Sequence, residues 1–318
     1  SDMNSRTVKR IEDVNFLRSV QFAEDAGPMA HPIRPDSYIE IANFYTTTVY
    51  EKGSEVVRML HTLLGPGAFR RGSDLYFSRH DGSAATTDDF LEAMDDVADI
   101  ELEQFRRWFD QAGTPRVEVI ERLVDGTLAL PLAQSTPPTP GQAHKPPLHI
   151  PVAVGLIDAD GRELVTRELT FECSARAEVR ADSQSLLLHV TEAQTTLQVR
   201  GLKAQPRVSF LRGFSAPVRV TYLRDDASLA FLAVHDSDGF ARWDALQTLL
   251  DTKRNKLAGM GVLYSRVLGR KNHTRLYMAV SDPGHVDPLR HARGFARPAA
   301  QERLHRTVVG DIAGDLDR

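Results

Sequence analysis

The chain has 318 residues, of which 42% are hydrophobic and 26% are charged, and its mean hydropathy is −0.31. These values are typical of a water-soluble globular protein with room for two or three domains. The net charge of −4 argues against nucleic acid or an anionic membrane surface as the main partner, and no apolar stretch reaches the roughly 18–20 residues of a membrane span.

The single cysteine, Cys173, excludes an internal disulfide and a cysteine-based zinc site. One thiol fits a reducing compartment, and the first ten residues lack the apolar segment of a signal peptide. We therefore expect a cytoplasmic location.

Residues 1–114 are predicted to be mainly helical. Apolar residues recur at helical spacing in residues 8–22 and 56–64, and Gly65 is a candidate C-cap for the second run. A proline-rich loop, GPMAHPIRPDS, separates the two runs. More helix is expected before Gly113, with Thr87 as an N-cap.

From residue 115 the period changes from helical to alternating, which predicts β-strands. Six or seven short strands with regular turns, one of them at DADGRE, indicate an antiparallel β-sandwich over residues 115–223. A helix is predicted in GFARWDALQTLLDTKRN, from about Asp238. The sequence after about Lys253 is basic and poorly periodic, with at best two short helices.

A self-contained metal site is not expected. The eleven histidines are scattered, and no His-Glu-x-x-His pair occurs. His61 is interpreted as a partly exposed helix residue, and His291 and His305 as surface residues. Paired acidic residues at 88–89 and 95–96 are interpreted as a helix cap and a solvated helix face. No Gly-x-Ser-x-Gly or phosphate-loop motif is present.

Two tyrosines stand out in NFYTTTVYEKGSEVVRML. Tyr45 and Tyr50 are five residues apart and precede an amphipathic helix. From these residues alone, two readings stay open: functional side chains, or aromatic packing at a strand-to-helix junction.

A longer stretch around these tyrosines carries a resemblance. QFAEDAGPMAHPIRPDSYIEIANFYTTTVYEKGSEVVRMLHTLLG, with LYFSRHDGSAATTDDFLEAM and QFRRWFDQAGTP, resembles the zinc aminopeptidases of the M1 family. The likeness is dense to about residue 114, looser to about residue 250, and faint beyond, around DPLRHARGFAR.

The resemblance implies a multidomain α+β fold. Its parts would be the helical C-terminal half of a thermolysin-like catalytic domain (residues 1–114), an antiparallel β-sandwich (115–223) and the start of a divergent α-helical domain (224–318). It also implies that Tyr50 donates a hydrogen bond to the oxyanion of the tetrahedral intermediate. Tyr45 would line the pocket for the N-terminal side chain of a peptide substrate.

The family binds Zn²⁺ through a His-Glu-x-x-His helix and a further glutamate, and it holds the substrate amine with a Gly-x-Met-Glu-Asn motif. Neither motif occurs in the 318 residues. We therefore expect this chain alone to hold no zinc and to be inactive, whereas the intact enzyme would remove N-terminal residues from peptides. The alternatives are a non-enzymatic module that complements a separate N-terminal half, and a gene remnant without function.

Overall fold

A computed structural model describes residues 5–36, 40–164, 169–180 and 184–268. Tertiary contacts divide the chain into two compact units, Ser1–Asp251 and Thr252–Arg318. In the second unit, the described residues form the last part of helix α7 (Gly239–Leu268). All other elements belong to the first unit.

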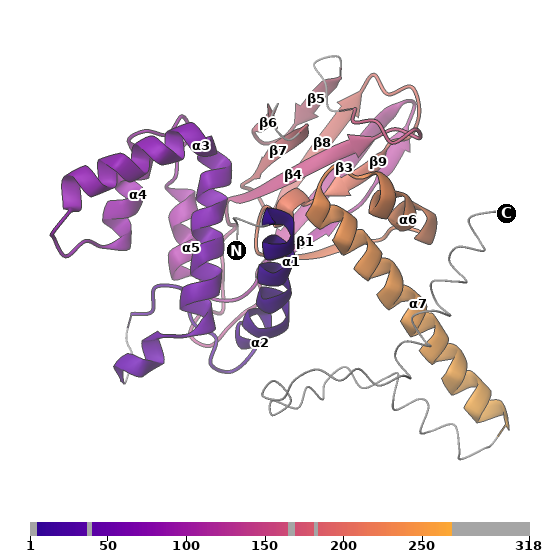
Figure 1. The fold of residues 1–318 in the computed structure, drawn as a ribbon, viewed down its shortest axis with the longest axis horizontal. Helices are drawn as coiled ribbons and strands as arrows, with labels where there is room; N and C mark the ends of the chain where they lie inside the picture. The colour runs from indigo at the N-terminus through magenta and orange to yellow at the C-terminus, as the bar shows by residue number, and fades with distance from the viewer. Residues whose placement is uncertain (1–4, 37–39, 165–168, 181–183, 269–318) are drawn as a thin grey trace. The chain divides into compact units, whose positions relative to one another are not determined.

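The first unit begins with a helical block. Its elements are α1 (Arg6–Phe16), the π-helix η1 (Leu17–Gln21), α2 (Phe22–Glu24), the 3-10 turn η2 (Ile41–Phe44), the π-helix η3 (Thr48–Lys52), α3 (Gly53–His80), α4 (Thr87–Asp95), the 3-10 turn η4 (Gln104–Arg106) and α5 (Arg107–Asp110). Helix α4 packs on α3 (Figure 1). The predicted helical character of this block is confirmed.

Two helix boundaries differ in detail from the prediction. The backbone leaves helical geometry at Gly65, with φ 73° and ψ 164°, and Pro66 then opens a second helical segment that continues to His80. The expected helix end at Gly65 is therefore a break within α3. The N-cap of α4 is Thr86, where Thr87 was predicted, and Asp89 completes a reciprocal capping box with Thr86.

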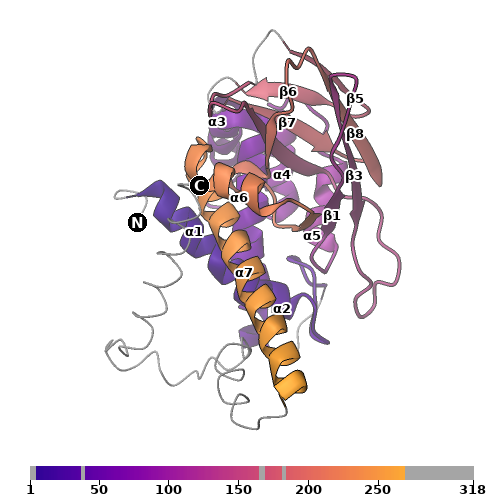
Figure 2. The ribbon, with the colours of Figure 1, turned by 90° about the vertical axis from the view of Figure 1, so that its right-hand side faces the viewer.

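Ten strands follow in the described residues. They are β1 (Arg116–Val119), β2 (Arg122–Val124), β3 (Thr127–Ser135), β4 (Ile150–Ile157), β5 (Thr170–Cys173), β6 (Ala177–Arg180), β7 (Ser185–Val190), β8 (Gln194–Arg200), β9 (Arg207–Phe210) and β10 (Arg219–Tyr222). One sheet has the order β10-β1-β3-β8-β5 with β2 beside β3, and the other has the order β6-β7-β4-β9. The two sheets form the layers of a sandwich (Figure 2).

The pairing is antiparallel except at one edge, where β1 and β10 run parallel, so the prediction of a wholly antiparallel sandwich needs that correction. In the first sheet β3 alternates between buried and partly exposed residues, which is typical of a strand with one covered face. In the second sheet every residue of β7 is buried. This sheet is covered on its outer face too: Trp108 of α5 donates from Nε1 to the carbonyl of His149 at 2.8 Å, and Arg180 of β6 donates to two carbonyls of α3.

After the sandwich come α6 (Asp226–His235) and α7. The sequence reading missed α6, although Asp225 caps it by accepting from the backbone N–H of Ser228 at 2.6 Å. The predicted start of α7 near Asp238 is confirmed, but the helix runs to Leu268, beyond the predicted end. Residues 269–318, including His291, His305 and DPLRHARGFAR, lie outside the described residues. No described helix is long and apolar enough to cross a membrane.

Candidate functional site around Tyr45 and Tyr50

Tyr45 and Tyr50 form a stacked pair on the surface of the helical block. Their ring centroids are 6.2 Å apart and their planes differ by 23°. The rings are 60% and 58% exposed, so neither side chain is part of the core. Tyr45 follows the 3-10 turn η2, and Tyr50 lies in the π-helix η3, so the expectation of a strand before these residues is wrong.

Three consecutive threonines shape the π-helix that carries Tyr50. The hydroxyl of Thr46 accepts from the backbone N–H of Val49 at 3.2 Å, and its carbonyl accepts from that of Tyr50 at the same distance. Thr47 donates to the carboxylate of Glu24. Thr48 is fully buried and accepts from the amide of Gln21 at 3.2 Å. Because Gln21 ends the other π-helix, η1, the two rare π turns are joined side chain to side chain; such turns often occur at functional sites.

A buried ion pair lies two residues beyond Tyr50. The ammonium of Lys52 donates to Asp25 Oδ2 and to the carbonyl of Gly113, both at 2.9 Å. Thr114 donates to the same carboxylate oxygen at 2.9 Å. The side chains of Lys52 and Asp25 are each 1% exposed. Lys52 therefore ties η3 both to the segment after η1 and to the entry of the sandwich.

The electrostatics of this pair favour the charged forms. Burial by itself would raise the pKa of Asp25, but the charge and hydrogen bond of Lys52, with hydrogen bonds from Gln21 and Thr114, lower that pKa below its usual value. A second ammonium, that of Lys145, donates to the Ala112 carbonyl at 2.6 Å. Burial, together with the charge of Lys52, lowers the pKa of Lys145 to about 8.

A second buried pair holds the start of α3. Glu55 accepts from both terminal nitrogens of Arg10, at 2.5 and 2.6 Å, in a bidentate arrangement. Arg10 also donates to the carbonyls of Gly213 and Phe214, at 2.9 Å each. The helix that follows Tyr50 is thus fixed to α1 and to the loop before β10.

The described residues do not fit a zinc site. No three His, Cys, Asp or Glu side chains among them converge as metal ligands. His61, which the sequence reading set aside as a partly exposed helix residue, is exposed, and its ring meets that of Phe69 edge-on at 5.1 Å. Tyr45 and Tyr50 are the sequence-predicted site residues that the structure brings together.

Sequence reasoning missed the residues beneath the tyrosines. Asp25 and Lys52 are 27 positions apart, and Lys52 reads locally as the charged start of a helix. The only available signal was that Lys52 stands directly between the tyrosine stretch and the apolar stripe of α3. A long-range pair of this kind becomes visible only in three dimensions.

Comparison with known families covers each part of the chain. Residues 3–109 match the Peptidase family M1 domain. Residues 113–223 match a domain of unknown function (DUF3458) with an Ig-like fold, and residues 226–296 match its C-terminal companion, described as ARM repeats.

Individual relatives agree. Aminopeptidase N of Escherichia coli (strain K12) is 48% identical over 254 residues, which are 79% of this chain and 28% of the relative. Aminopeptidase N of Caulobacter vibrioides is 47% identical over 252 residues, 78% of this chain and 27% of the relative. The chain therefore spans a little over a quarter of the length of these relatives.

A solved structure supports the fold alone. The crystal structure of Legionella pneumophila aminopeptidase A in complex with aspartic acid aligns with a TM-score of 0.63 at 21% identity, covering 98% of this chain and 36% of that one. A helical block, a sandwich that matches an Ig-like domain, and helices α6 and α7 give the described chain a mixed α and β structure, and its first part is similar to the M1 peptidase domain. Residues 3–109 therefore belong to the M1 peptidase domain family, and the chain is similar to aminopeptidase N over 79% of its length.

Proposed function

We propose that this chain supplies part of the active site of an M1 aminopeptidase that removes N-terminal residues from peptides. The observation that carries the proposal is the stacked, exposed pair of Tyr45 and Tyr50 within the segment that matches the M1 peptidase domain. The names of the relatives support the aminopeptidase activity.

In this proposal Tyr50 is an oxyanion donor. A phenol is neutral below a pH of about 10 and carries one O–H, so it can donate a hydrogen bond to developing negative charge without bringing its own charge. The backbone bond to Thr46 and the buried Lys52–Asp25 pair support a fixed position for it. Tyr45 stacks on Tyr50 and forms a wall for the side chain of the first substrate residue.

The proposal assigns residues 1–114 to a thermolysin-like catalytic domain, residues 115–223 to the sandwich and residues 224–318 to the helical domain. Zn²⁺ belongs to the intact enzyme, and its ligands lie outside these 318 residues, which contain no His-Glu-x-x-His. The chemistry assigned to this chain is the hydrogen bond from Tyr50. The lone free thiol, Cys173, supports a cytoplasmic setting, because a reducing compartment does not require disulfides.

A complementation assay tests the proposal. The chain is mixed with an N-terminal M1 polypeptide that carries His-Glu-x-x-His and Gly-x-Met-Glu-Asn, and turnover of an aminoacyl-p-nitroanilide is measured with zinc. We expect activity in the mixture and none from either part alone. Tyr50→Phe should lower kcat by about 10²–10³, the usual cost of one oxyanion donor.

Matched tyrosine variants locate the effect. Tyr76→Phe, where the ring packs edge-on against Phe90 at 5.4 Å, should leave turnover unchanged. Tyr45→Phe keeps the stacked ring and should change KM more than kcat. Robust zinc-dependent turnover by this chain alone, or equal kcat for Tyr50→Phe and wild type, would refute the assignment.

Large exposed apolar side chains favour a second possibility, a non-enzymatic module that associates with a separate N-terminal half. Several of them lie in the segment that matches the M1 domain: Val8, Phe16, Val20, Met29, Ile41, Tyr45, Tyr50 and Val57. Exposed apolar groups of this size mark interaction surfaces when they are contiguous. Association in sedimentation analysis without any turnover would favour this module, and a lack of both would favour a gene remnant.

A further inference from the structure

A cavity of about 300 Å³ lies where η1, α2, the sandwich and the first turns of α7 meet, and three arginines line it. They are Arg18 from η1, Arg219 from β10 and Arg224 from the turn before α6. We call this cavity the arginine groove. One carboxylate, that of Asp244, also lines it, and Arg18 already binds this carboxylate.

The other two guanidiniums have no counter-ion among the residues that the structure describes. Arg219 reaches only the carbonyl of Phe22, at 3.5 Å, and the Nε of Arg224 is buried without a hydrogen-bond acceptor. A buried cation without a partner is costly, so such a group calls for an explanation. Arg224 is therefore a partly buried cation without an ion pair, and Arg219 is an exposed cation without one, among the residues described.

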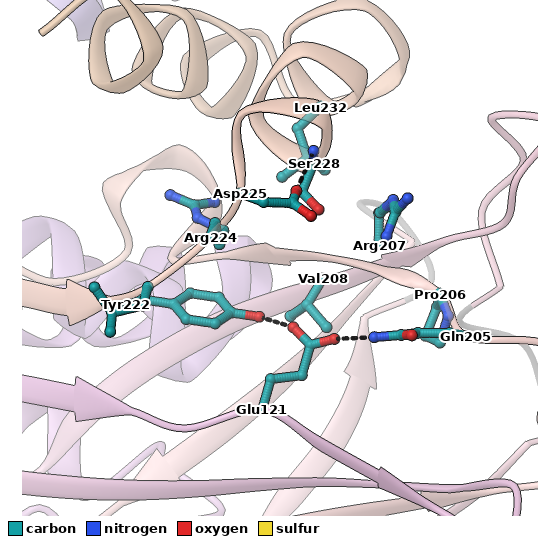
Figure 3. Close-up of a pocket in the computed structure, with 11 residues that line it drawn as sticks. Glu121, Gln205, Pro206, Arg207, Val208, Tyr222, Arg224, Asp225, Ser228 and Leu232 are labelled. Carbon is teal, nitrogen blue, oxygen red and sulfur yellow. Dashed lines mark hydrogen bonds between the residues drawn. The ribbon is translucent and has the colours of Figure 1, made fainter. Parts of the chain in front are cut away.

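Asp244, Asp236 and Glu121 favour the charged form of Arg224 through space, but in the part of the chain that the structure describes none of them forms an ion pair with it, because each nearby carboxylate is bound to another group. Glu121 accepts from the hydroxyl of Tyr222 and from the amide of Gln205, and the side chain of Arg224 points away from it (Figure 3). Asp236 pairs with Arg212 at 2.9 Å. Asp225 caps helix α6 through Ser228.

Each arginine of the groove is held against an aromatic ring. The guanidinium carbon lies 4.9 Å from the Phe214 ring for Arg18, 4.9 Å from the Phe22 ring for Arg219 and 5.1 Å from the Tyr222 ring for Arg224. Cation–π contacts fix the heads without using their N–H donors. The N–H donors of Arg219 and Arg224 that make no other bond are thus left for a ligand, and their positions are set before it binds.

We propose that the arginine groove binds a small dianion, a phosphate or a dicarboxylate. Guanidinium forks match the oxygens of both groups, with charge-assisted hydrogen bonds. A cavity of about 300 Å³ is at the lower end of ligand pockets, which suits a ligand of this size. The groove is lined by residues of the helical block, the sandwich and α7. A bound anion would therefore stabilise the packing of these three parts.

Binding can be measured directly on the full chain. Inorganic phosphate and succinate are each titrated by calorimetry, and the thermal midpoint is followed in parallel, with sodium chloride at matched ionic strength as the reference. We expect one site per chain for at least one of the two anions, and a midpoint that rises with its concentration beyond the chloride effect. Phosphate alone, or succinate alone, identifies the ligand class.

Variants decide whether the groove is the site. Arg219→Gln, at an exposed position, and Arg224→Gln should each weaken binding by about tenfold or more, because each removes a charged donor. Arg70→Gln removes an exposed arginine that pairs with Asp74, and it should leave binding unchanged. The proposal is overturned if neither anion acts beyond chloride, or if both groove variants bind within twofold of wild type.

Discussion

Two junctions between the helical block and the sandwich differ in how their charged side chains are paired. Beneath Tyr50, each buried charge has a partner: Lys52 meets Asp25 at 2.9 Å, and Arg10 meets Glu55 in a bidentate pair. In the arginine groove, Arg219 and Arg224 have no carboxylate partner among the described residues.

The difference separates structure from binding. A fully paired buried charge is a fixed joint, because breaking it strands its partner away from water. An unpaired charged side chain persists where water hydrates it or a ligand supplies the opposite charge. We therefore interpret the Lys52 junction as the support of the tyrosine pair, and the arginine groove as a place left open for an anion.

The largest effect is expected from breaking the paired junction. Lys52→Met leaves the carboxylate of Asp25 buried and without its cation, so the free energy of unfolding should fall by about 3–5 kcal/mol. Urea denaturation followed by tryptophan fluorescence, to which the buried Trp108 and the partly buried Trp243 contribute, measures the change.

Two controls show whether the stranded charge causes the loss. Lys203→Met, at an exposed position, should be nearly neutral. Asp25→Asn combined with Lys52→Met should lose less stability than Lys52→Met alone, because the remaining amide carries no charge. If the free energy of unfolding of Lys52→Met lies within about 1 kcal/mol of the wild-type value, this junction is not a fixed joint.

A third junction is neutral and gives an intermediate effect that depends on pH. His149 and His189 are buried side by side, with Nε2 of the first 3.1 Å from Nδ1 of the second. Burial, then the charges of His189 and Arg176, lower the pKa of His149 to about 3. The pKa of His189 is lowered too, mainly by burial, although Glu178 opposes this.

The sign follows from the unfolded chain, where histidine has a pKa of about 6.5 and binds the proton more readily. Stability is therefore full above that pH and falls by about 1.4 kcal/mol per pH unit below it, or about 2 kcal/mol between pH 7 and 5. Asp25 affects stability at a lower pH than the histidines do. Because its pKa is depressed in the folded state, its contribution to the free energy of unfolding is present above about pH 4 and is lost below. Denaturation curves between pH 7.5 and 5 isolate the histidines.

Substitutions test whether the two histidines cause this dependence of stability on pH. His149→Gln should flatten the loss of stability toward pH 5, whereas His144→Gln, at an exposed position, should leave it unchanged. An unaltered slope in His149→Gln would place the acid sensitivity elsewhere.

The spacing of apolar residues in the sequence was enough to predict the helices and strands that have a repeating apolar pattern. The helices around Val56 and Leu64 and the alternation along β3 came from this signal. Helix α6 was missed because apolar residues surround most of its circumference, and the parallel pairing of β1 with β10 was missed because register between distant strands leaves no local mark.

The site divides in the same way. Tyr45 and Tyr50 were singled out through a family pattern, and their role stays a prediction; the structure adds that their rings stack and that both residues are exposed. Asp25, Lys52 and the groove arginines were not found, because a charged residue in a sequence is by default a surface residue. Whether a charged residue is in fact buried or paired depends on contacts between segments as far apart in the sequence as Arg18 and Asp244.

The smallest stability effect is expected in the arginine groove, and it sharpens the opening contrast. Without multivalent anions, Arg224→Gln removes a partly buried cation that has no direct ion pair to lose, and its contact with the Tyr222 ring and the more distant carboxylates of Asp244, Asp236 and Glu121 are what favour the native residue. The free energy of unfolding should therefore change by less than about 1 kcal/mol. With saturating phosphate or succinate the gap between wild type and variant should widen, since only the wild type gains from binding. A loss comparable to that of Lys52→Met in the absence of anions would make Arg224 a structural joint, and the two junctions would then be of one kind.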